Sequence, residues 1–371
     1  MNSIYNKLSK EEALPLVLRE IYESRGYNKY KMGEFVPYDI YLDHRNFLRE
    51  EGIITFTGAD GKLMALKPDV TMSVVKNVSD ETVTKKVFYY ENVFRISNNQ
   101  NEEINQIGVE FIGGEDLYAS AEVIELACRS LEAISSKYIL SINDMGFMAG
   151  LLDELKLSDE AEYELSNVLK LKSLTALKKF CGKYSIDDKH CDYLRNIIRL
   201  EGPFAEVLID AKSLCLNEKM ELALDELDEL FNTLKAIKLS DKIKLDLSIV
   251  NDLDYYNGII FKGYINGVPK AVLSGGRYDN LMHRLNKKQA AVGFAIYLSY
   301  IDRLFRNETK YNTEAVIYYG NSGTKDVAIA VSKLSEKYKS VRAEKINLNH
   351  VKAEKEFNLV NKVIEEVEEN A

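Results

Sequence analysis

The chain has 371 residues, and this length exceeds what one compact core usually holds, so two or three domains are expected. The formal net charge of −9 disfavours binding to nucleic acid, because proteins that neutralise phosphates usually present a basic face. No apolar run is long enough to cross a bilayer and the N-terminus has no apolar signal core, which predicts a cytoplasmic protein without membrane contact.

The first part of the chain alternates between helical and strand-like patterns. Residues 8–25 carry apolar positions at helical spacing, and residues 27–32 have a strand-like pattern. Residues 54–66 contain two alternating runs joined by an Asp-Gly pair, which is a strong hairpin signal. Residues 67–71, with a proline in the first turn, then predict the start of a helix.

Two strands and a long helix are predicted next. Residues 86–96 are apolar and aromatic enough for a buried strand, and a polar loop over residues 97–103 separates them from a second strand over residues 104–113. The two strands are therefore predicted to form a hairpin. Residues 115–136 have the pattern of an amphipathic helix, and residues 138–142 indicate a further strand.

From residue 145 to about residue 237 the pattern is almost wholly helical. This block interrupts the strand-rich parts, so we interpret it as an inserted subdomain. Residues 243–249 then alternate with the period of a half-buried strand. Runs over residues 259–265 and 271–273, joined by an Asn-Gly pair, predict a second hairpin, and residues 290–305 predict a strand that continues into a helix.

The stretch from Lys244 to Leu281 is dense in Tyr, Asp, Arg and Gly at its predicted strand ends. Such residues are typical of a small-molecule pocket, because aromatic walls and a few fixed polar groups orient a ligand. The alternative is a plain antiparallel hairpin with amphipathic tyrosines at its rim. The pattern alone gives the two interpretations similar weight.

A new pattern starts at about Thr313. A strand is followed by a helix over residues 325–338, a second strand over residues 340–346 and an acidic helical end. These elements predict a small α/β unit of roughly sixty residues, which is near the lower limit for folding alone.

The cysteines and histidines give no sign of a metal centre. Cys128, Cys181, Cys191 and Cys215 lack paired spacing, and the four histidines are far apart in the sequence. Scattered cysteines argue against a disulfide framework and a zinc site, and they fit a reducing cytoplasm. We therefore expect no metal.

Four stretches, in this order, resemble motifs in the catalytic domain of histidyl-tRNA synthetases. They are LKPDVT at Leu66–Thr71, the segments FRIS and NQIGVEFIG within Phe94–Gly113, the hairpin segments Leu253–Phe261 and Gly275–Leu281, and AVGFAI at Ala291–Ile296. Each motif alone is weak, and the ordered set is strong. The resemblance covers roughly residues 8–305. It implies an α+β fold of the class II aminoacyl-tRNA synthetase type, with an antiparallel sheet flanked by helices, usually in a dimer.

The resemblance and the patterns together predict four parts. Residues 1–144 and 238–310 make the synthetase-like core, and the second of these carries the histidine-recognition hairpin and the segment similar to motif 3. Residues 145–237 form the helical insertion. Residues 311–371 form the small C-terminal α/β domain.

The positions that hold ATP in that family differ in this chain. Arg95 matches the arginine that holds the α-phosphate, but Ser97 and Glu102 stand where a glutamate and an arginine are expected. Asn251 and Tyr300 replace two further arginines. Adenylyl transfer depends on cationic groups that stabilise the developing charge. The resemblance therefore implies that this chain does not adenylate an amino acid.

The positions that contact histidine in the family are better kept. Carboxylates there can bind the ammonium group or the imidazole N–H, and a pair of tyrosines can enclose a flat ring. The alternative is that Gln106 and Glu110 are merely one face of a strand and that Tyr256 is a rim residue. The resemblance implies these histidine-binding residues: Asp69, Thr71, Arg95, Gln106, Glu110, Tyr255, Tyr256 and Tyr278.

A synthetase-like domain that keeps an amino-acid pocket without the ATP-binding arginines resembles the regulatory subunits of ATP phosphoribosyltransferase. The resemblance implies a chain with no catalysis or cofactor of its own, which assembles with the short catalytic subunit, typically as a hetero-octamer, and with itself as a dimer. It also implies a requirement for the first step of histidine biosynthesis and feedback inhibition by histidine. Gly33 stands where the dimer motif usually has proline, which leaves the form of the dimer contact open.

Two other functions stay open at this point. One is a divergent histidyl-tRNA synthetase or a related amino-acid adenylating enzyme, against which the residues on the nucleotide side argue. The other is a histidine-sensing module of a different regulator. A neighbouring gene for a short ATP phosphoribosyltransferase would distinguish that module from a regulatory subunit.

Overall fold

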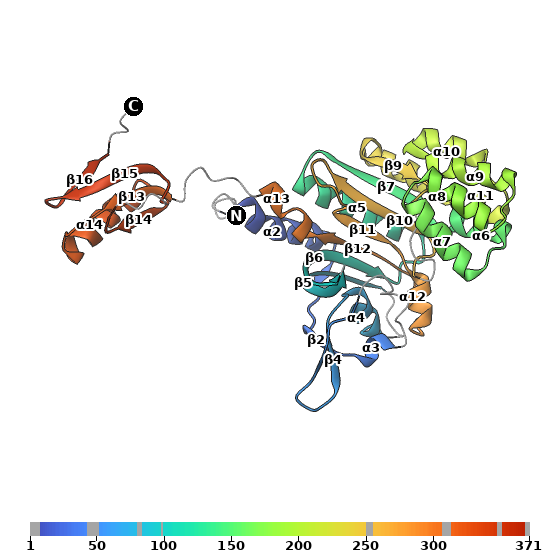
Figure 1. Ribbon diagram of the computed structural model, residues 1–371, viewed down its shortest axis with the longest axis horizontal. Coiled ribbons are helices and arrows are strands. Elements are labelled where there is room, and N and C mark those ends of the chain that lie inside the picture. The colour runs from blue at the N-terminus through green and yellow to red at the C-terminus, as the bar shows by residue number, and fades with distance from the viewer. Residues whose placement is uncertain are drawn as a thin grey trace. The chain divides into compact units, whose positions relative to one another are not determined.

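The computed structural model describes residues 8–42, 52–79, 84–97, 99–249, 255–305, 313–346 and 351–367. The chain divides into two compact units, Met1–Phe305 and Arg306–Ala371 (Figure 1). No helix in the described ranges is long and apolar enough to cross a membrane.

The first unit is built on a nine-stranded sheet, which is antiparallel except for the pairs β1/β5 and β7/β9. The predicted strand pairs before and after the helical block both lie in it. In sheet order the strands are β1 (Asn28–Lys29), β5 (Lys85–Ser97), β6 (Gln100–Ile112), β12 (Ala291–Tyr297), β11 (Leu273–Arg277), β10 (Ile259–Ile265), β7 (Tyr138–Asp144), β9 (Ile243–Asp246) and β8 (Glu201–Pro203).

One face of this sheet packs against α2 (Lys10–Glu23) and α5 (Leu117–Ile134). A capping box at Ser9 begins α2, and the buried Tyr22 ring of that helix lies 5.9 Å from the ring of Phe88 in β5. At β5 and β6 the opposite face is covered by α4 (Thr71–Lys76) and α12 (Asp279–Arg284), whose apolar side chains pack on Tyr89. The short elements η3 (Leu298–Tyr300) and α13 (Asp302–Phe305) follow β12.

Residues 145–237 form the predicted run of helices, interrupted by the short strand β8. Figure 1 shows these helices in green beside β7 and β9, and α11 packs on β7 while α10 packs on β8 and β9. The element η2 (Ser240–Lys242) leads from α11 into β9. The helices are α6 (Met145–Leu155), α7 (Asp159–Lys170), α8 (Leu174–Lys183), α9 (Asp188–Arg199), α10 (Phe204–Lys212) and α11 (Glu218–Ala236).

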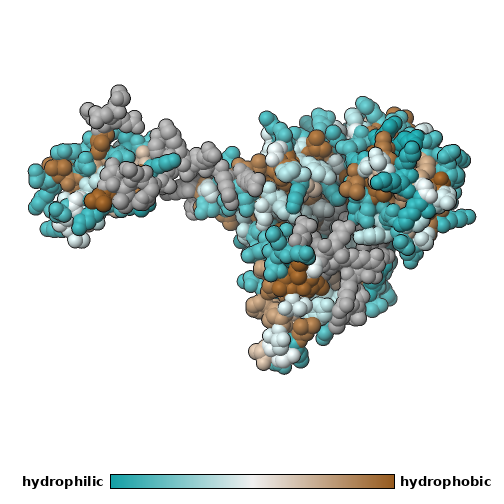
Figure 2. Space-filling view, in the orientation of Figure 1, coloured by the Kyte–Doolittle hydropathy of each residue, from teal (hydrophilic) through white to brown (hydrophobic). Residues whose placement is uncertain are grey.

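A small three-stranded sheet in the order β2-β4-β3 projects from the first unit next to α3 (Asp39–Leu42). Its strands are β2 (Phe35–Pro37), β3 (Thr55–Thr57) and β4 (Leu63–Leu66), and the predicted Asp-Gly hairpin joins β3 to β4. Figure 2 shows hydrophobic side chains gathered over this part of the surface, where Phe35 is 62% exposed and Leu63 is 48% exposed. Apolar surface of this kind is typical of a face that a partner covers.

The predicted polar loop over residues 97–103 is wrong. β5 continues to Ser97 and β6 begins at Gln100, so most of the predicted loop is strand, with Arg95 directly opposite Glu102. Polar side chains hold this extension together, because Asn92 donates to Glu103 at 2.6 Å. Cross-strand hydrogen bonds of this kind stabilise a strand pair without the apolar alternation on which the prediction relied.

The cysteines also differ from expectation. Cys181 in α8 and Cys191 in α9 form a disulfide, with their Cα atoms 6.2 Å apart. The packing of α8 against α9 brings these two residues together, although they are ten positions apart in the sequence. Cys128 and Cys215 are unpaired.

The described part of the second unit is a four-stranded sheet in the order β14-β13-β15-β16 together with the helix α14 (Thr324–Ser335). The strands are β13 (Thr313–Tyr318), β14 (Val341–Glu344), β15 (Ala353–Val360) and β16 (Val363–Glu366). The predicted acidic helical end is wrong, because β15 and β16 form an antiparallel hairpin whose turn holds Asn361 and Lys362 at positive φ. Phe357 and Leu359 in β15 are buried while Asn358 and Val360 are exposed, which is the two-residue period of a strand.

Candidate functional site

The candidate site centres on Glu110, a buried carboxyl in β6. Directly across the sheet it faces Gly293 in β12, which in turn faces Gly276 in β11. A Cβ atom at Gly293 would lie 1.9 Å from Oε2 of Glu110, so the absence of a side chain there is what makes room for the carboxyl group. The two glycines thus leave space on the sheet beside Glu110.

Two hydroxyl groups hold Glu110. Thr71 donates from Oγ1 to Oε1 at 2.6 Å, and Tyr278 donates from its hydroxyl to Oε2 at 2.6 Å. Burial raises the pKa of Glu110 to about 8, against the opposing effect of these hydrogen bonds, and the charge of Asp69 raises it further. A cation placed beside Glu110 would favour its ionised form, so the site is suited to a positively charged ligand group.

Asp69 supplies a second carboxylate just before α4. Its Oδ1 accepts a hydrogen bond from the backbone N–H of Met72 at 2.7 Å, which fixes the side chain at the start of that helix. Burial raises the pKa of Asp69, while the Met72 N–H and the charge of Arg95 act in the opposite direction. Two carboxyls in one partly dehydrated site repel each other, and a shared cation relieves that repulsion.

Three tyrosine rings form an aromatic wall at the site. The ring of Tyr255 lies 4.5 Å from that of Tyr256 and 5.9 Å from that of Tyr278. Burial raises the pKa of all three hydroxyls above the ordinary value, and a hydrogen bond with Thr71 opposes this for Tyr255. The hydroxyls are therefore neutral and able to donate, and the rings offer flat apolar surface to a ligand.

Arg95 and Gln106 lie at the edges of this arrangement. Arg95 in β5 donates from Nε to the carbonyl oxygen of Pro68 at 2.7 Å, which ties it to the segment that carries Asp69. Gln106 is buried on the same face of β6 as Glu110, four residues away, or about 13 Å along the strand. The structure thus brings Thr71, Glu110 and Tyr278 into direct contact and places Gln106 further along the strand.

The positions predicted to correspond to the ATP-binding arginines of histidyl-tRNA synthetases carry other side chains with other contacts. Tyr300, at a position where an arginine was expected, lies under the ammonium group of Lys270 and 5.2 Å from the ring of Tyr297. Glu102 lies opposite Arg95 in the β5–β6 pair and so adds negative charge beside that arginine. Asn251 lies outside the described residues.

Sequence reasoning missed Gly293 and the buried ion pair of Lys67 with Glu91. The lysine and glutamate lie beside the site, with Glu91 directly opposite Gln106, and both are nearly fully buried. A glycine inside an apolar strand is the signal that would have pointed to Gly293, because such a residue often marks a close approach. Within the described ranges no group of three or more His, Cys, Asp or Glu residues is placed to hold a metal ion.

Comparison with known proteins gives the family. The model of the histidyl-tRNA synthetase family matches residues 6–301. A protein from Clostridium kluyveri is 28% identical over 368 residues, which is 95% of this chain and 93% of that protein. One from Clostridium botulinum is 30% identical over 291 residues, 75% of this chain and 68% of that protein. Both are named ATP phosphoribosyltransferase regulatory subunit. This chain belongs to the family of histidyl-tRNA synthetases and ATP phosphoribosyltransferase regulatory subunits.

Solved structures share the fold. An ATP phosphoribosyltransferase regulatory subunit/histidyl-tRNA synthetase from Bacillus halodurans matches with a TM-score of 0.76 and 23% identity, covering 92% of this chain and 90% of that chain. Histidyl-tRNA synthetase from Nostoc matches with a TM-score of 0.71 and 20% identity, covering 91% and 83%. A chain of the ATP phosphoribosyl transferase (HisG:HisZ) complex from Thermotoga maritima matches with a TM-score of 0.61 and 20% identity, covering 78% and 97%. The predicted class II synthetase fold is therefore confirmed.

Proposed function

We propose that this chain is the regulatory subunit of ATP phosphoribosyltransferase and acts with a short catalytic subunit in the first step of histidine biosynthesis. The names of the relatives from two Clostridium species support this assignment, as does the likeness to a chain of the Thermotoga maritima complex. The exposed apolar surface on β2 and β4 supports assembly with a protein partner or a second copy, and the net charge of −9 favours protein over tRNA. A hetero-octamer that contains a dimer of this chain is the expected form.

The chain itself has no catalytic role in this proposal. Transfer to or from the α-phosphate of ATP needs several cations around the developing negative charge. Arg95 is the retained cation on that side, and it is tied to the Pro68 carbonyl with Glu102 opposite it. The tilted rings of Tyr297 and Tyr300, with centroids 5.2 Å apart, add no cation on that side. The chemistry of the complex then belongs to the catalytic subunit.

The effector in this proposal is histidine, bound at Glu110. The single observation that carries it is the buried Glu110 carboxyl, which accepts hydrogen bonds from Thr71 and Tyr278 beside a second carboxylate and an aromatic wall. An unpaired carboxylate is costly to keep in such a place, and an ammonium group or an imidazole N–H would pair with it. The ring of histidine would meet the tyrosines.

Feedback control requires that histidine bind more tightly to one state of the complex than to another, since a ligand shifts an equilibrium only by its differential affinity. Mixing the chain with the short catalytic subunit and measuring mass and activity together tests the assignment. We expect one complex, higher activity than the catalytic subunit alone, and inhibition by histidine. Absence of a complex, with binding of tRNA instead, would reject the regulatory role.

A pair of variants tests the site within that complex. Glu110→Ala should raise the histidine concentration needed for half inhibition while the complex still forms. Glu336→Ala removes an exposed carboxylate that follows α14 in the second unit, and it should leave inhibition unchanged. Equal inhibition of both variants and wild type would place histidine sensing elsewhere.

A further inference from the structure

A cavity of about 300 Å³ lies on the same face of the main sheet as Glu110, towards its other end. Gly108 in β6 lies on the same face of the sheet as Glu110. Directly paired residues connect Gly108 across the sheet to Lys262 in β10, so Lys262, which lines the cavity, lies on that face too. Strand β10 is three strands from β6, and β9 is five, which corresponds to about 15 and 24 Å at the usual spacing. The cavity is thus separate from the candidate histidine site.

The described lining of this cavity carries excess positive charge. Four lysines and two carboxylates line it, a formal balance of +2 in a chain whose net charge is −9. The lysines come from three separate parts of the chain, namely the end of α7 and the turn after it, β9, and β10. These charged residues are Lys170, Lys172, Lys244, Lys262, Glu201 and Asp246.

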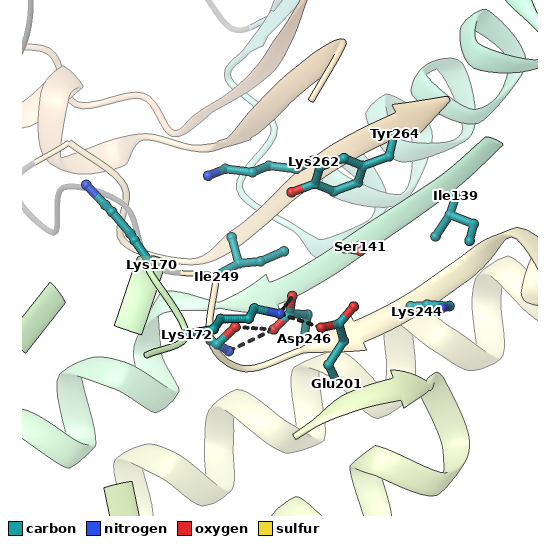
Figure 3. Close-up of a pocket in the computed structure, with 11 residues that line it drawn as sticks. Ile139, Ser141, Lys170, Lys172, Glu201, Lys244, Asp246, Ile249, Lys262 and Tyr264 are labelled. Carbon is teal, nitrogen blue, oxygen red and sulfur yellow. Dashed lines mark hydrogen bonds and ion pairs between the residues drawn. The ribbon is translucent and has the colours of Figure 1, made fainter. Parts of the chain in front are cut away.

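The two carboxylates are already satisfied. Lys172 donates to Asp246 at 2.8 Å and to Glu201 at 2.5 Å, and the dashed lines of Figure 3 show this lysine between them. The buried Asp246 also accepts from the hydroxyl and the backbone N–H of Ser248. Burial lowers the pKa of Lys172, but its hydrogen bonds with the two carboxylates outweigh this and raise the pKa overall. Lys172 and its two carboxylate partners therefore form an ion-paired part of the cavity wall.

The backbone conformation of Lys172 indicates that this ion-paired part of the wall is held in place. Lys172 follows α7 with φ of 49°, in the left-handed region that glycine usually occupies at a helix end. A lysine in that conformation is less favourable than glycine, and here its ammonium group reaches Asp246 in β9. The turn after α7 and the end of β9 are thereby joined.

We propose that this cavity binds a small anion that carries phosphate groups. Lys244 and Lys262 come from different strands and both line the cavity, and Ser141 lies between them in the sheet. In Figure 3, the ring of Tyr264 lies beside Lys262, and Lys244 lies on the other side of Ser141. Ammonium groups only donate hydrogen bonds, and a phosphate offers several acceptor oxygens to them.

The shape and the overall charge favour a small molecule over a macromolecule. The volume of about 300 Å³ is at the lower end of the range for small-molecule sites. A nucleic-acid backbone would meet a chain with a net charge of −9, which opposes its approach outside the cavity. The proposal does not depend on histidine binding or on the catalytic partner.

Titration of the full-length chain with inorganic pyrophosphate, at constant ionic strength set with chloride, tests this proposal. Calorimetry gives the dissociation constant, and hydrogen exchange locates the site. We expect saturable binding with slower exchange in β7, β9 and β10. The double variant Lys244→Gln/Lys262→Gln should weaken binding about tenfold, since two charge-assisted contacts at a partly exposed site are lost.

Two further variants separate charge from fold. Lys262→Arg keeps the positive charge and should bind pyrophosphate within about twofold of wild type. Lys333→Gln removes an exposed lysine of α14 in the second unit and should leave binding unchanged. The thermal midpoint of each variant without ligand checks that it folds. Absence of binding to wild type, equal binding by the double variant, or protection at β5 in place of β7, β9 and β10 would overturn the proposal.

Discussion

Histidine binding should release a proton from Glu110, and calorimetry can count it. The raised pKa of about 8 means that much of the Glu110 carboxyl population is protonated at pH 7.5 in the free chain. A histidine ammonium group paired with Glu110 requires the ionised form. Binding at pH 7.5 should therefore release protons to the buffer, up to about one per site, because the imidazole of free histidine is then mostly neutral.

The measurement is titration of histidine into the chain in two buffers of different ionisation enthalpy, PIPES and Tris. The slope of the observed enthalpy against the buffer enthalpy gives the number of protons released. Glu110→Gln keeps the shape of the side chain but has no proton to release, so its slope should be close to zero. The same variant should bind histidine about 2–4 kcal/mol more weakly, the cost of removing one partner of a desolvated charge pair.

The free energy of unfolding of the unliganded chain gives an independent check with a defined sign. The pKa of Glu110 is raised in the folded state, so its contribution to stability is fully present below about pH 4.5 and is lost as the pH rises through about 8. Wild type should therefore lose stability relative to Glu110→Gln across this window. Wild-type affinity in Glu110→Gln, together with buffer-independent binding enthalpies in wild type, would refute the assignment of Glu110 as the ligand's partner.

Three further results are expected. The chain should show no histidine-dependent exchange of pyrophosphate into ATP, and exchange above a buffer blank would favour a working synthetase. Gly293→Ala should weaken histidine binding at least tenfold and lower stability by about 1–3 kcal/mol, because the new methyl group overlaps the Glu110 carboxyl. The matched control is Gly182→Ala in α8, where the space around the glycine is open, and it should not destabilise the chain. Tyr256→Phe should weaken histidine binding by only about 1 kcal/mol in calorimetry, since the ring stays and at most one hydrogen bond is lost; a loss as large as that of Glu110→Gln would contradict this.

Much of the first unit could be predicted because its signals are local. The Asp-Gly pair between β3 and β4 and the Asn-Gly pair between β10 and β11 specify tight turns through their own backbone preferences. The start of α2 was equally readable, since Ser9 and Glu12 form the capping box within one turn. The four motifs in their order then predicted the class II synthetase fold, which no single periodic pattern could have predicted.

The errors lie where distant contacts decide the structure. The acidic end after the strand predicted over residues 340–346 was assigned to a helix, but pairing of β15 with both β13 and β16 makes residues 353–366 largely strand. The extension of β5 and β6 depends on cross-strand hydrogen bonds between polar residues, and the disulfide depends on how α8 packs on α9. Propensity carries little information about such partners, since packing in the folded state overrides it.

The sequence predicted which residues belong to the candidate site, but it did not predict how they are arranged. Motif similarity pointed to Glu110, Thr71 and Tyr278, and the structure adds that both hydroxyls converge on one carboxyl. The requirement for Gly293 and the lysine-lined cavity near β9 were not predicted, because each depends on which strands are neighbours in the sheet. Strand order is a property of the whole fold, so residues far apart in the sequence become a site only through it.

The arrangement also explains how a synthetase fold could serve as a sensor. An adenylating enzyme must hold an amino acid and a nucleotide together, so under the proposed function the loss of cations on the nucleotide side would remove the reaction and leave the amino-acid pocket in place. A sensor needs only that pocket and two states that bind its ligand differently. Glu110 could provide such a pocket, because its carboxyl accepts hydrogen bonds from a residue of α4 and from the residue after β11. These contacts join separate parts of the core around one carboxyl. Histidine bound there would stabilise whichever state keeps those parts closest together, and this would be the physical basis of its control over a partner.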